Sequence, residues 1–390
     1  MKMNKSLFWL YCLSASVYFG QGISGLVDLP VFFFMKDKLG LDESRIMFLT
    51  SLITLIWCGK PVLGHAIDNW NISKKKWVLF SLIATTILSL LIGWLPIIPI
   101  GILIALMALS SSFAAVRDVS VDGIMVVEGK KNNIIGRIQS VQWISITVAS
   151  ILTGFLGGYI ADHYSYQVAF NLLIPVYLII IMILFQYKNV VEVKREKTSI
   201  LGTMKVLFTD RNLLIVGLFI FLYKLAPAFG TPLTFIMQDN FGWTKTFIGL
   251  LDTIGAGVGI IGALLYFKFS KQINMMKWLK VSVWVGAITT LAYLWYNPVT
   301  AIIYDVVFNI IGMFVSLLLL DYAARNSKKG FESTSFALLC SASNLASTCD
   351  GFLGSWLFPI IGLQWLIVIS AVSSFLCLLI IPYLKKDKLC

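Results

Sequence analysis

Apolar runs long enough to cross a membrane recur from one end of this chain to the other. A helix needs about 20 apolar residues to cross the roughly 30 Å hydrocarbon layer of a bilayer. Of the 390 residues, 58% are hydrophobic and only 13% are charged, which excludes a soluble globular domain. We predict an all-α membrane protein with twelve transmembrane helices. Their expected limits are 7–34, 44–66, 77–95, 97–127, 135–161, 166–187, 211–237, 246–268, 278–296, 298–324, 332–358 and 362–384.

The chain has a net charge of +12, and its basic residues are unevenly distributed over the connections between these runs. Most lysines and arginines lie in alternate connections, such as the cluster 74–76, and few lie in the others. By the positive-inside rule, the basic connections and both termini face the cytoplasm. The basic character therefore reports topology, and we expect the lipid bilayer, not nucleic acid, as the partner of this chain.

The composition excludes several kinds of site. The six cysteines form no CxxC pair, and His65 and His163 are the only histidines, so a zinc site or a metalloprotease lacks ligands. No nucleotide-binding signature and no recognisable nucleophile with a base is present. We therefore expect no enzyme activity, no metal and no cofactor.

The chain divides into two halves with a shared sequence pattern. PVFFFMKDKLGLDESRI starts at Pro30 and resembles PLTFIMQDNFGWTKTFI, which starts at Pro232; GFLGGYI at Gly154 resembles GFLGSWL at Gly351. We predict an N-terminal six-helix bundle over 1–188, a cytoplasmic linker over 189–210 and a C-terminal six-helix bundle over 211–390. Two repeated bundles are typical of major facilitator transporters, whose solute site lies near the membrane midplane between the halves.

Four segments resemble the folate-biopterin transporter family of that superfamily. They are Lys60-Pro61 with Gly64, Asp68 and the basic cluster; DVSVDGIMVVEG over 118–129; GRIQSVQW over 136–143; and FESTSFALLCSASNLASTCDGFLG over 331–354. The resemblance implies the major facilitator fold, a folate, pterin or similar organic solute, and a loop acid, Asp68, that helps to lock one conformation. Families that carry muropeptides or acetyl-coenzyme A, or that assemble pigment complexes, share parts of the pattern, so the fold alone does not choose the cargo.

Ionisable residues inside the predicted spans are candidate functional groups, because a charge in the bilayer needs a partner or water. Asp118 and Asp122 are one helical turn apart and share a face, whereas Arg117 points about 100° away. Lys60 has the same predicted depth, so we predict an ion pair between Lys60 and Asp118 or Asp122. This pair is a cytoplasmic gate, a fixed structural salt bridge, or part of proton coupling through Asp122. The other candidate gating or coupling residues are Asp28, Asp68, Glu128 and Asp252.

Arg117 and Lys224 are the cations best placed for an anionic solute. Lys224 precedes Pro227, Gly230 and Pro232, which predict a broken helix whose free backbone groups line a cavity. The alternative is that Lys224 pairs with an acid and never meets the solute. The candidate acids are Asp252 and Asp305, and Asp305 is also a candidate substrate-binding residue.

Amides and a ring in the predicted fifth span fit a planar heterocycle. Gln139, Gln142 and Trp143 offer stacking and hydrogen bonds to a nitrogen and carbonyl edge. The alternative is that the glutamines hold helices together, and Gln21 presents the same choice. In SASNLASTCDG, which is dense in small residues, Asn344 and Asp350 are the candidates for the solute cavity.

The sequence predicts a multi-pass secondary transporter of the cell (inner or plasma) membrane. We expect a monomer that moves a folate, pterin or similar small-molecule solute by alternating access, with proton coupling. Two alternatives remain: a major facilitator transporter of another solute, such as a muropeptide, an acyl-coenzyme A or a drug, and a non-transporting membrane sensor or assembly factor. The charges in cavity-type helices favour transport, because a scaffold does not need them.

Overall fold

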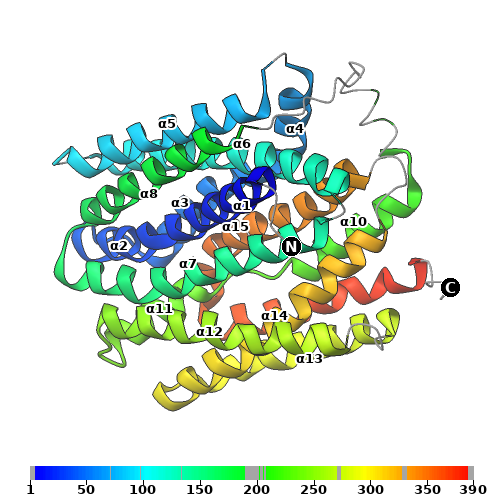
Figure 1. The fold of residues 1–390 in the computed structure, drawn as a ribbon. Coiled ribbons are helices and arrows are strands. Elements are labelled where there is room, and N and C mark those ends of the chain that lie inside the picture. The colour runs from blue at the N-terminus through cyan, green and yellow to red at the C-terminus, as the bar shows by residue number, and fades with distance from the viewer. Residues whose placement is uncertain are drawn as a thin grey trace. The chain divides into compact units, whose positions relative to one another are not determined.

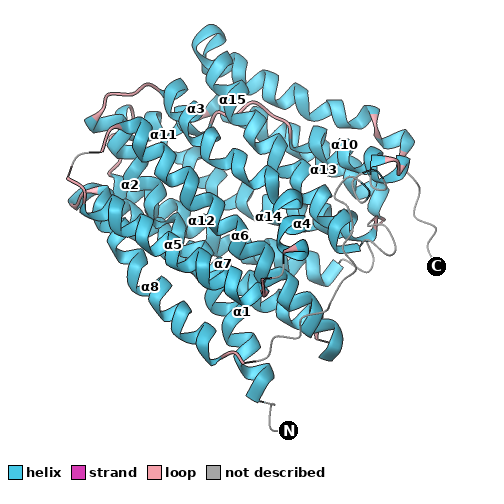
Figure 2. Ribbon diagram, turned by 90° about the horizontal axis from the view of Figure 1, so that it is seen from above, coloured by secondary structure: helices cyan, strands magenta, loops and turns pink. Residues whose placement is uncertain are grey.

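The computed structural model describes residues 5–70, 72–96, 98–132, 134–188, 202, 205, 208–269, 274–326 and 332–384. Every regular element in these residues is a helix (Figure 1, Figure 2). The longer helices before residue 189 are α1 (Lys5–Ile23), α2 (Asp28–Phe33), α3 (Glu43–Thr54), α4 (Lys60–Asn69), α5 (Lys74–Trp94), α6 (Ile100–Asn132), α7 (Ile135–His163) and α8 (Tyr166–Gln186). Those after it are α10 (Arg211–Lys224), α11 (Gly230–Asp239), α12 (Lys245–Phe269), α13 (Met275–Ala292), α14 (Pro298–Arg325) and α15 (Glu332–Ser373).

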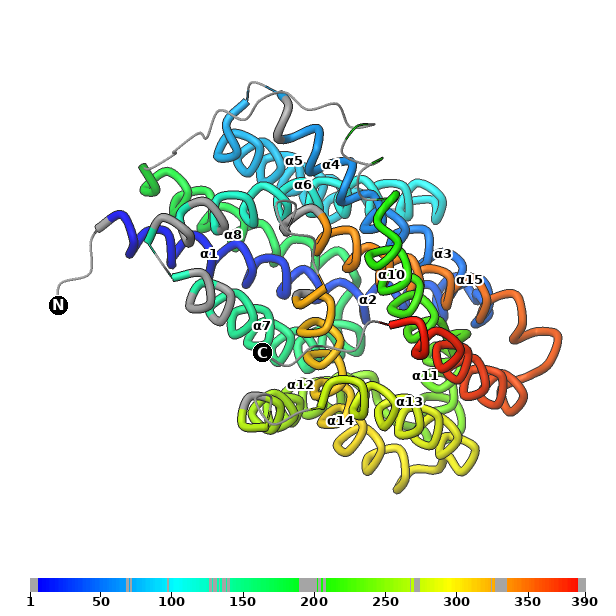
Figure 3. Tube along the Cα trace, turned by 90° about the vertical axis from the view of Figure 1, so that its right-hand side faces the viewer, coloured from blue at the N-terminus to red at the C-terminus, as the bar shows by residue number. Residues whose placement is uncertain are grey.

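Ten helical segments of the described residues are long and apolar enough to cross a membrane. The predicted all-α membrane protein is therefore confirmed, whereas the number of twelve spans and the side of the termini stay predictions. Two features account for the smaller number. The predicted seventh span is broken into α10 and α11, of 14 and 10 residues. The predicted last two spans are joined in α15 through Gly362, whose φ of 72° is not helical. Figure 3 shows the chain turning back between the orange and red parts of α15.

Contacts between residues divide the chain into two compact units, and neither unit is one continuous segment. Unit 1 comprises 1–40, 62–198 and 244–253, and unit 2 comprises 41–61, 199–243 and 254–390. Each unit therefore contains a short segment from the other predicted half. The division into bundles 1–188 and 211–390 stays a prediction, and its linker, 189–210, lies almost wholly outside the described residues.

In unit 1, α5 packs against α6 and α8, and α1 packs against α7. Small residues permit the second contact, because a Cβ atom on Gly22 would lie 2.7 Å from Cβ of Ala149. The Asn171 amide of α8 donates to the Gly93 carbonyl of α5 at 3.1 Å. Close backbone approach and side-chain amides are the usual means by which helices associate in lipid.

In unit 2, α10, α13, α14 and α15 share an apolar core. Val216, Phe219, Leu279 and Tyr322 are fully buried in it, and the Phe219 and Tyr322 rings meet edge to face with centroids 5.9 Å apart. This edge-to-face geometry is favoured between aromatic rings. The core fixes α10 and α14, which carry two candidate polar residues, Lys224 and Asp305.

The sequence repeat corresponds to the same local structure in both copies. Gly40 ends the first copy's helical segment with φ 62°, and Gly242 follows α11 with φ 68°. This left-handed conformation is easy only for glycine, so the shared glycine has the same structural cause in both places.

Candidate functional site

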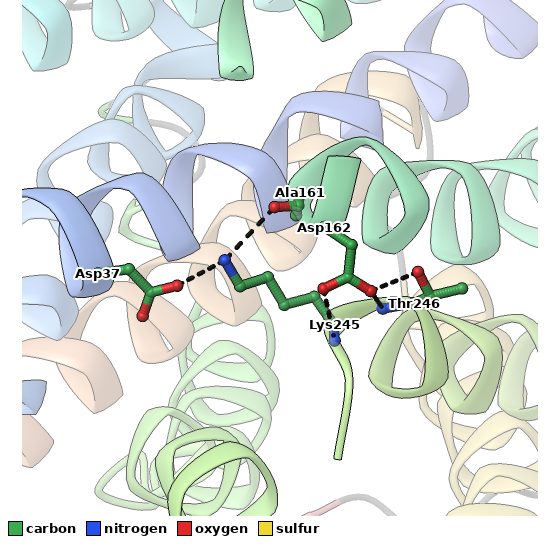
Figure 4. A network of polar contacts seen from close by, with 5 residues as sticks. All are labelled: Asp37, Ala161, Asp162, Lys245 and Thr246. Carbon is green, nitrogen blue, oxygen red and sulfur yellow. Dashed lines mark hydrogen bonds and ion pairs between the residues drawn. The ribbon is translucent and has the colours of Figure 1, made fainter. Parts of the chain in front are cut away.

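A polar network joins the ends of three helical segments in unit 1 (Figure 4). The Lys245 ammonium, at the start of α12, lies 2.5 Å from Oδ2 of Asp37 and donates to the Ala161 carbonyl at 3.4 Å. Asp162, at the end of α7, accepts the backbone N–H groups of Lys245 and Thr246 at 3.2 and 2.6 Å, and also the Thr246 hydroxyl. A carboxylate from another helix thus caps the first turn of α12, whose N–H groups have no partner within that helix.

This ion pair is better shielded than a surface salt bridge. The side chains of Lys245 and Asp37 are only 20% and 27% exposed, and the ammonium also lies over the Phe33 ring at 5.1 Å. Water screens such a pair less than an exposed one, so the attraction is stronger.

Beside this network, α7 and α12 meet backbone to backbone. A Cβ atom on Gly154 would lie 2.7 Å from the Gly249 carbonyl oxygen, and one on Gly158 would lie 3.1 Å from Cα of Gly249. The Thr253 hydroxyl donates to the Ile151 carbonyl at 2.8 Å and accepts the N–H of residue 155 at 2.7 Å. We call the contact between 150–162 and 245–253 the α7–α12 seam.

Unit 2 contains a second contact of the same kind, between α3 and α15. A Cβ atom on Gly351 would overlap the Ser51 side chain, and the Asn344 amide donates to the Trp57 carbonyl at 3.4 Å. We call this contact the α3–α15 seam. It gives Asn344, a predicted substrate residue, a helix-packing contact within its own unit.

The two seams use equivalent positions of the sequence repeat. Gly154 and Gly351 each begin a GFLG motif, and their opposing residues, Thr253 and Ser51, lie at the same position counted from Pro232 and Pro30. The repeated motif was predicted from the sequence, but its partner residues were not, because periodicity within a helix does not identify the neighbouring helix.

Sequence reasoning selected none of the residues of the polar network. One signal for them existed: Lys245 is an isolated cation in a predicted connection that is otherwise free of lysine and arginine. An isolated cation beside a membrane helix needs a partner. Asp37 lies within the repeated segment that starts at Pro30, and Asp162 follows GFLGGYI by two residues.

The predicted break in the seventh span is confirmed, since α10 ends at Lys224 and α11 begins at Gly230. Its backbone groups are not free, however. The Ala226 N–H donates to Oδ1 of Asp350 at 2.7 Å, and the Ser370 hydroxyl donates to the Pro227 carbonyl at 2.6 Å. Asp350 thus provides the hydrogen-bond acceptor for a backbone N–H group at the helix break, where the membrane offers no water.

Asp350→Ala is expected to destabilise unit 2 by about 1–3 kcal/mol, because the Ala226 N–H loses its acceptor. Asp350→Asn should cost less, since the amide oxygen can still accept that bond. Thermal unfolding in detergent measures both, with Ser355→Ala as the control, because that hydroxyl bonds only within its own helix. Equal melting temperatures for Asp350→Ala and the unchanged protein would contradict this role.

Lys224 lines a cavity of about 150 Å³ within unit 2, between α10, α14 and α15. Ser316 and Ser343 supply hydroxyl groups to an otherwise apolar wall. Asp350 is the acid that interacts electrostatically with Lys224. The site therefore combines one ammonium group with hydrogen-bonding groups that suit an anion.

Arg117 lies inside unit 1, and its side chain is only 1% exposed. The guanidinium donates to the Thr85 hydroxyl at 3.3 Å and lies 5.4 Å from the centre of the Tyr177 ring. These contacts bind α6 to α5 and α8, so they favour a packing role over the predicted contact with solute.

The two aspartates of α6 differ in their surroundings. Asp118 is buried, whereas Asp122 is half-buried and accepts a hydrogen bond from the Tyr18 hydroxyl of α1. At the end of α6, the buried Glu128 keeps one oxygen without a hydrogen-bond donor among the described residues. Glu128 interacts electrostatically with the Tyr187 hydroxyl at the end of α8.

The remaining predicted residues lie in several elements. Asp28 of α2 and Asp252 of α12 interact electrostatically within unit 1, and Gln21 of α1 is half-buried. In α7, Gln142 is half-buried and Trp143 is exposed. Lys60 lies 4.5 Å from the centre of the Trp57 ring; its predicted pairing with α6 would join the two units and stays a prediction. The side chains of Asp68 and Gln139 lie outside the described part.

Known proteins resemble this chain over most of its length. Residues 21–390 match the profile of the BT1 family. A folate-biopterin transporter of Synechocystis sp. is 27% identical over 400 residues, covering 96% of this chain and 78% of that protein. Folate transporter 1 of Plasmodium falciparum is 25% identical over 357 residues, covering 86% and 70%.

Solved structures with the same fold are transporters. A D-xylose–proton symporter superposes with a TM-score of 0.74 at 12% identity, covering 98% of both chains. The nucleoside transporter NupG gives 0.71 at 13% identity, covering 97% of this chain and 99% of that one. At this identity, the likeness establishes the fold and not the solute.

Proposed function

Because this chain belongs to the BT1 family, we propose that it is a secondary transporter that moves a folate, a pterin or a similar organic solute by alternating access. The family resemblance predicted from the sequence is confirmed. The fold is that of major facilitator transporters, the chain is a multi-pass membrane protein, and its relatives are transporters, not enzymes. The observation that carries the proposal on solute is the match, over nearly the whole chain, to relatives named for folate and biopterin transport.

The α7–α12 seam is proposed as the outer gate of this transporter. The positive-inside rule places Asp37, Asp162 and Lys245 on the face away from the cytoplasm. In this seam the two helix backbones touch, and a half-buried ion pair lies at one end of the contact. Such a contact has two states, formed and separated, because packed interfaces do not deform continuously. Alternating access requires that the seam separates when the solute site opens outward.

We propose that the aspartates of α6 take part in the gate that faces the cytoplasm and in proton coupling. Lys60 with Asp118 or Asp122 would form the gate facing the cytoplasm. Asp122, which is bonded to Tyr18, is the proposed proton-coupling group. We also propose that the transporter functions as a monomer in the cell membrane.

Counterflow in proteoliposomes tests the proposed solute. Vesicles loaded with unlabelled folate or biopterin should accumulate the labelled compound, and vesicles loaded with a muropeptide or an acyl-coenzyme A should not. Accumulation only with one of the latter compounds would replace the proposed solute class. Absence of counterflow with every compound would favour the sensor or assembly factor.

A further inference from the structure

A groove of about 430 Å³ lies on unit 2 beside the last helical turns of the chain. One wall is the first part of α13, and the other is formed by two short 3-10 helices, η6 (Ser374–Leu379) and η7 (Ile381–Tyr383). The residues that line the groove include Met276, Lys280 and Trp284 of α13 and Leu378, Ile381 and Leu384 of the final segment. Among the described residues of the lining, Lys280 is the only charged one, and the others are apolar or aromatic.

The three lining residues of α13 form a stripe along one side of this helix, because they follow one another at intervals of four residues. Lys280 is exposed, and Trp284 lies about 6 Å further along the helix axis. The Trp284 ring is 55% exposed and meets the Phe375 ring of η6 edge to face, with centroids 4.9 Å apart. This ring contact joins the two walls at one end of the groove.

The charged residues of the two walls are all basic. No aspartate or glutamate occurs over 253–304 or over 351–386, and these two stretches contain both walls. Lys277 is also exposed and precedes Lys280 by three residues, so the two ammonium groups can reach the same anion. In the sequence, Lys385 and Lys386 directly follow the final segment. The groove is therefore complementary to a ligand that combines an anion with an apolar part.

The order of these groups matches the order of layers in one membrane leaflet. The connection before α13 is one of the basic ones, so the positive-inside rule places the start of this helix at the cytoplasmic face. Lys280 lies roughly 8 Å along the axis from Met275, the first residue of α13. Trp284 follows, as indole rings do at membrane interfaces. The final segment runs toward the cytoplasm, so Leu378 lies deeper than Leu384.

We propose that this groove binds an anionic phospholipid of the cytoplasmic leaflet, with its phosphate at Lys280, its glycerol esters at Trp284 and an acyl chain along Leu378. The ammonium donates charge-assisted hydrogen bonds to the phosphate, and the indole N–H donates to an ester oxygen. Anionic lipids are concentrated in this leaflet and bind to basic pockets between membrane helices. The lipid contacts both walls, so it holds η6 and η7 against α13. None of these residues is a candidate for solute binding, so the proposal does not depend on the solute.

Three probes separate the parts of the ligand. Dioleoylphosphatidylglycerol carries a negative phosphate and two chains, dioleoylphosphatidylcholine carries the same chains without net charge, and glycerol 3-phosphate carries the phosphate without chains. Native mass spectrometry of the purified full-length protein in detergent measures the dissociation constant of each. The first phosphatidylglycerol molecule should bind about tenfold more tightly than phosphatidylcholine. Glycerol 3-phosphate should bind about a hundredfold more weakly than phosphatidylglycerol, because it buries no apolar surface.

Two variants of Lys280 test the phosphate contact. Lys280→Gln should weaken phosphatidylglycerol about ten- to a hundredfold, because it removes a hydrogen bond between charged groups, and should leave phosphatidylcholine unchanged. Lys280→Arg keeps the charge and should bind phosphatidylglycerol to within about threefold of the unchanged protein. Lys268→Gln is the matched control, because it removes an exposed lysine of α12 that does not line the groove, and it should leave all three probes unchanged.

The apolar contact and the stabilising effect are tested separately. Trp284→Leu should weaken both lipids by a similar factor of about three to ten, because the ring contacts the part that they share. Phosphatidylglycerol should raise the melting temperature of the unchanged protein and of Lys268→Gln more than that of Lys280→Gln, since a ligand that binds the folded state stabilises it.

Three results would overturn the inference. Equal affinity of Lys280→Gln and the unchanged protein for phosphatidylglycerol would show that Lys280 only extends into water. Equal affinity of the unchanged protein for the two lipids would show that the groove binds acyl chains without regard to charge. Binding of glycerol 3-phosphate as tightly as phosphatidylglycerol would assign the groove to a free phosphate compound.

Discussion

Gly158→Ala is expected to reduce transport about ten- to a hundredfold, whereas Gly157→Ala should leave it within about twofold. A Cβ atom on Gly158 would meet the backbone of Lys245 and of Gly249, the latter at 3.1 Å. Backbone cannot turn aside as a side chain can, so closing the α7–α12 seam would cost about 1–3 kcal/mol more. The closed state would become rarer by the corresponding factor. On Gly157, a Cβ atom meets its nearest neighbour at an ordinary 3.4 Å.

Transport and seam opening are measured on the same variants. Initial rates come from proteoliposomes. Opening comes from the labelling rate of a cysteine introduced at Ala161, whose carbonyl accepts from Lys245, with a maleimide that does not cross membranes. Slower transport should accompany faster labelling at an unchanged melting temperature. Slower transport with unchanged labelling would show that the seam is a fixed packing contact.

Reversing the charge of Lys245 is expected to reduce transport by more than about a hundredfold. Lys245→Glu loses the ion pair with Asp37 and brings a carboxylate toward both Asp37 and Asp162. Like charges in a shielded site repel by several kcal/mol, so the outer seam would stay open. Asp37→Lys alone should reduce transport as well, because the new lysine side chain would face the ammonium of Lys245. The double variant, Asp37→Lys with Lys245→Glu, should recover transport to within about tenfold.

The double-mutant cycle on transport rates isolates the pair. Arg45→Glu is the matched control, because it breaks an exposed ion pair with Asp42, whose side chains are 71% and 53% exposed. Exposed pairs contribute about 0–1 kcal/mol, so this variant should transport at nearly the normal rate. If the losses of transport rate in the two single variants add up in the double variant, the ion pair between Asp37 and Lys245 does not contribute to the gate.

Much of the fold follows from local sequence. Apolar length predicted the helices, and the prolines and glycine after Lys224 predicted the break that separates α10 from α11. The glycine that recurs in the repeat adopts the same left-handed conformation at Gly40 and Gly242. These features depend on residues close together in the chain, where helix length and backbone freedom decide the outcome.

The contacts of the candidate residues depend on which helices become neighbours, and the sequence does not encode that in a single periodicity. The helical wheel predicts that Arg117 points about 100° away from Asp118, but it does not identify Tyr177 as the ring beside the guanidinium. Lys224 interacts with Asp350 of α15, a partner more than a hundred residues away that also caps the break. Such pairings require the tertiary packing of the units.

The composition of unit 1 has a consequence for how the chain is made. Residues 244–253 complete this unit, yet a ribosome reaches them only after the preceding connection and the whole of α10 and α11 have been synthesised. Until then, the glycines of α7 have no α12 to pack against. During this interval the glycine face of α7 in the nascent first half has not yet packed against α12. Any factor that assists insertion of the first half would act on it in this state.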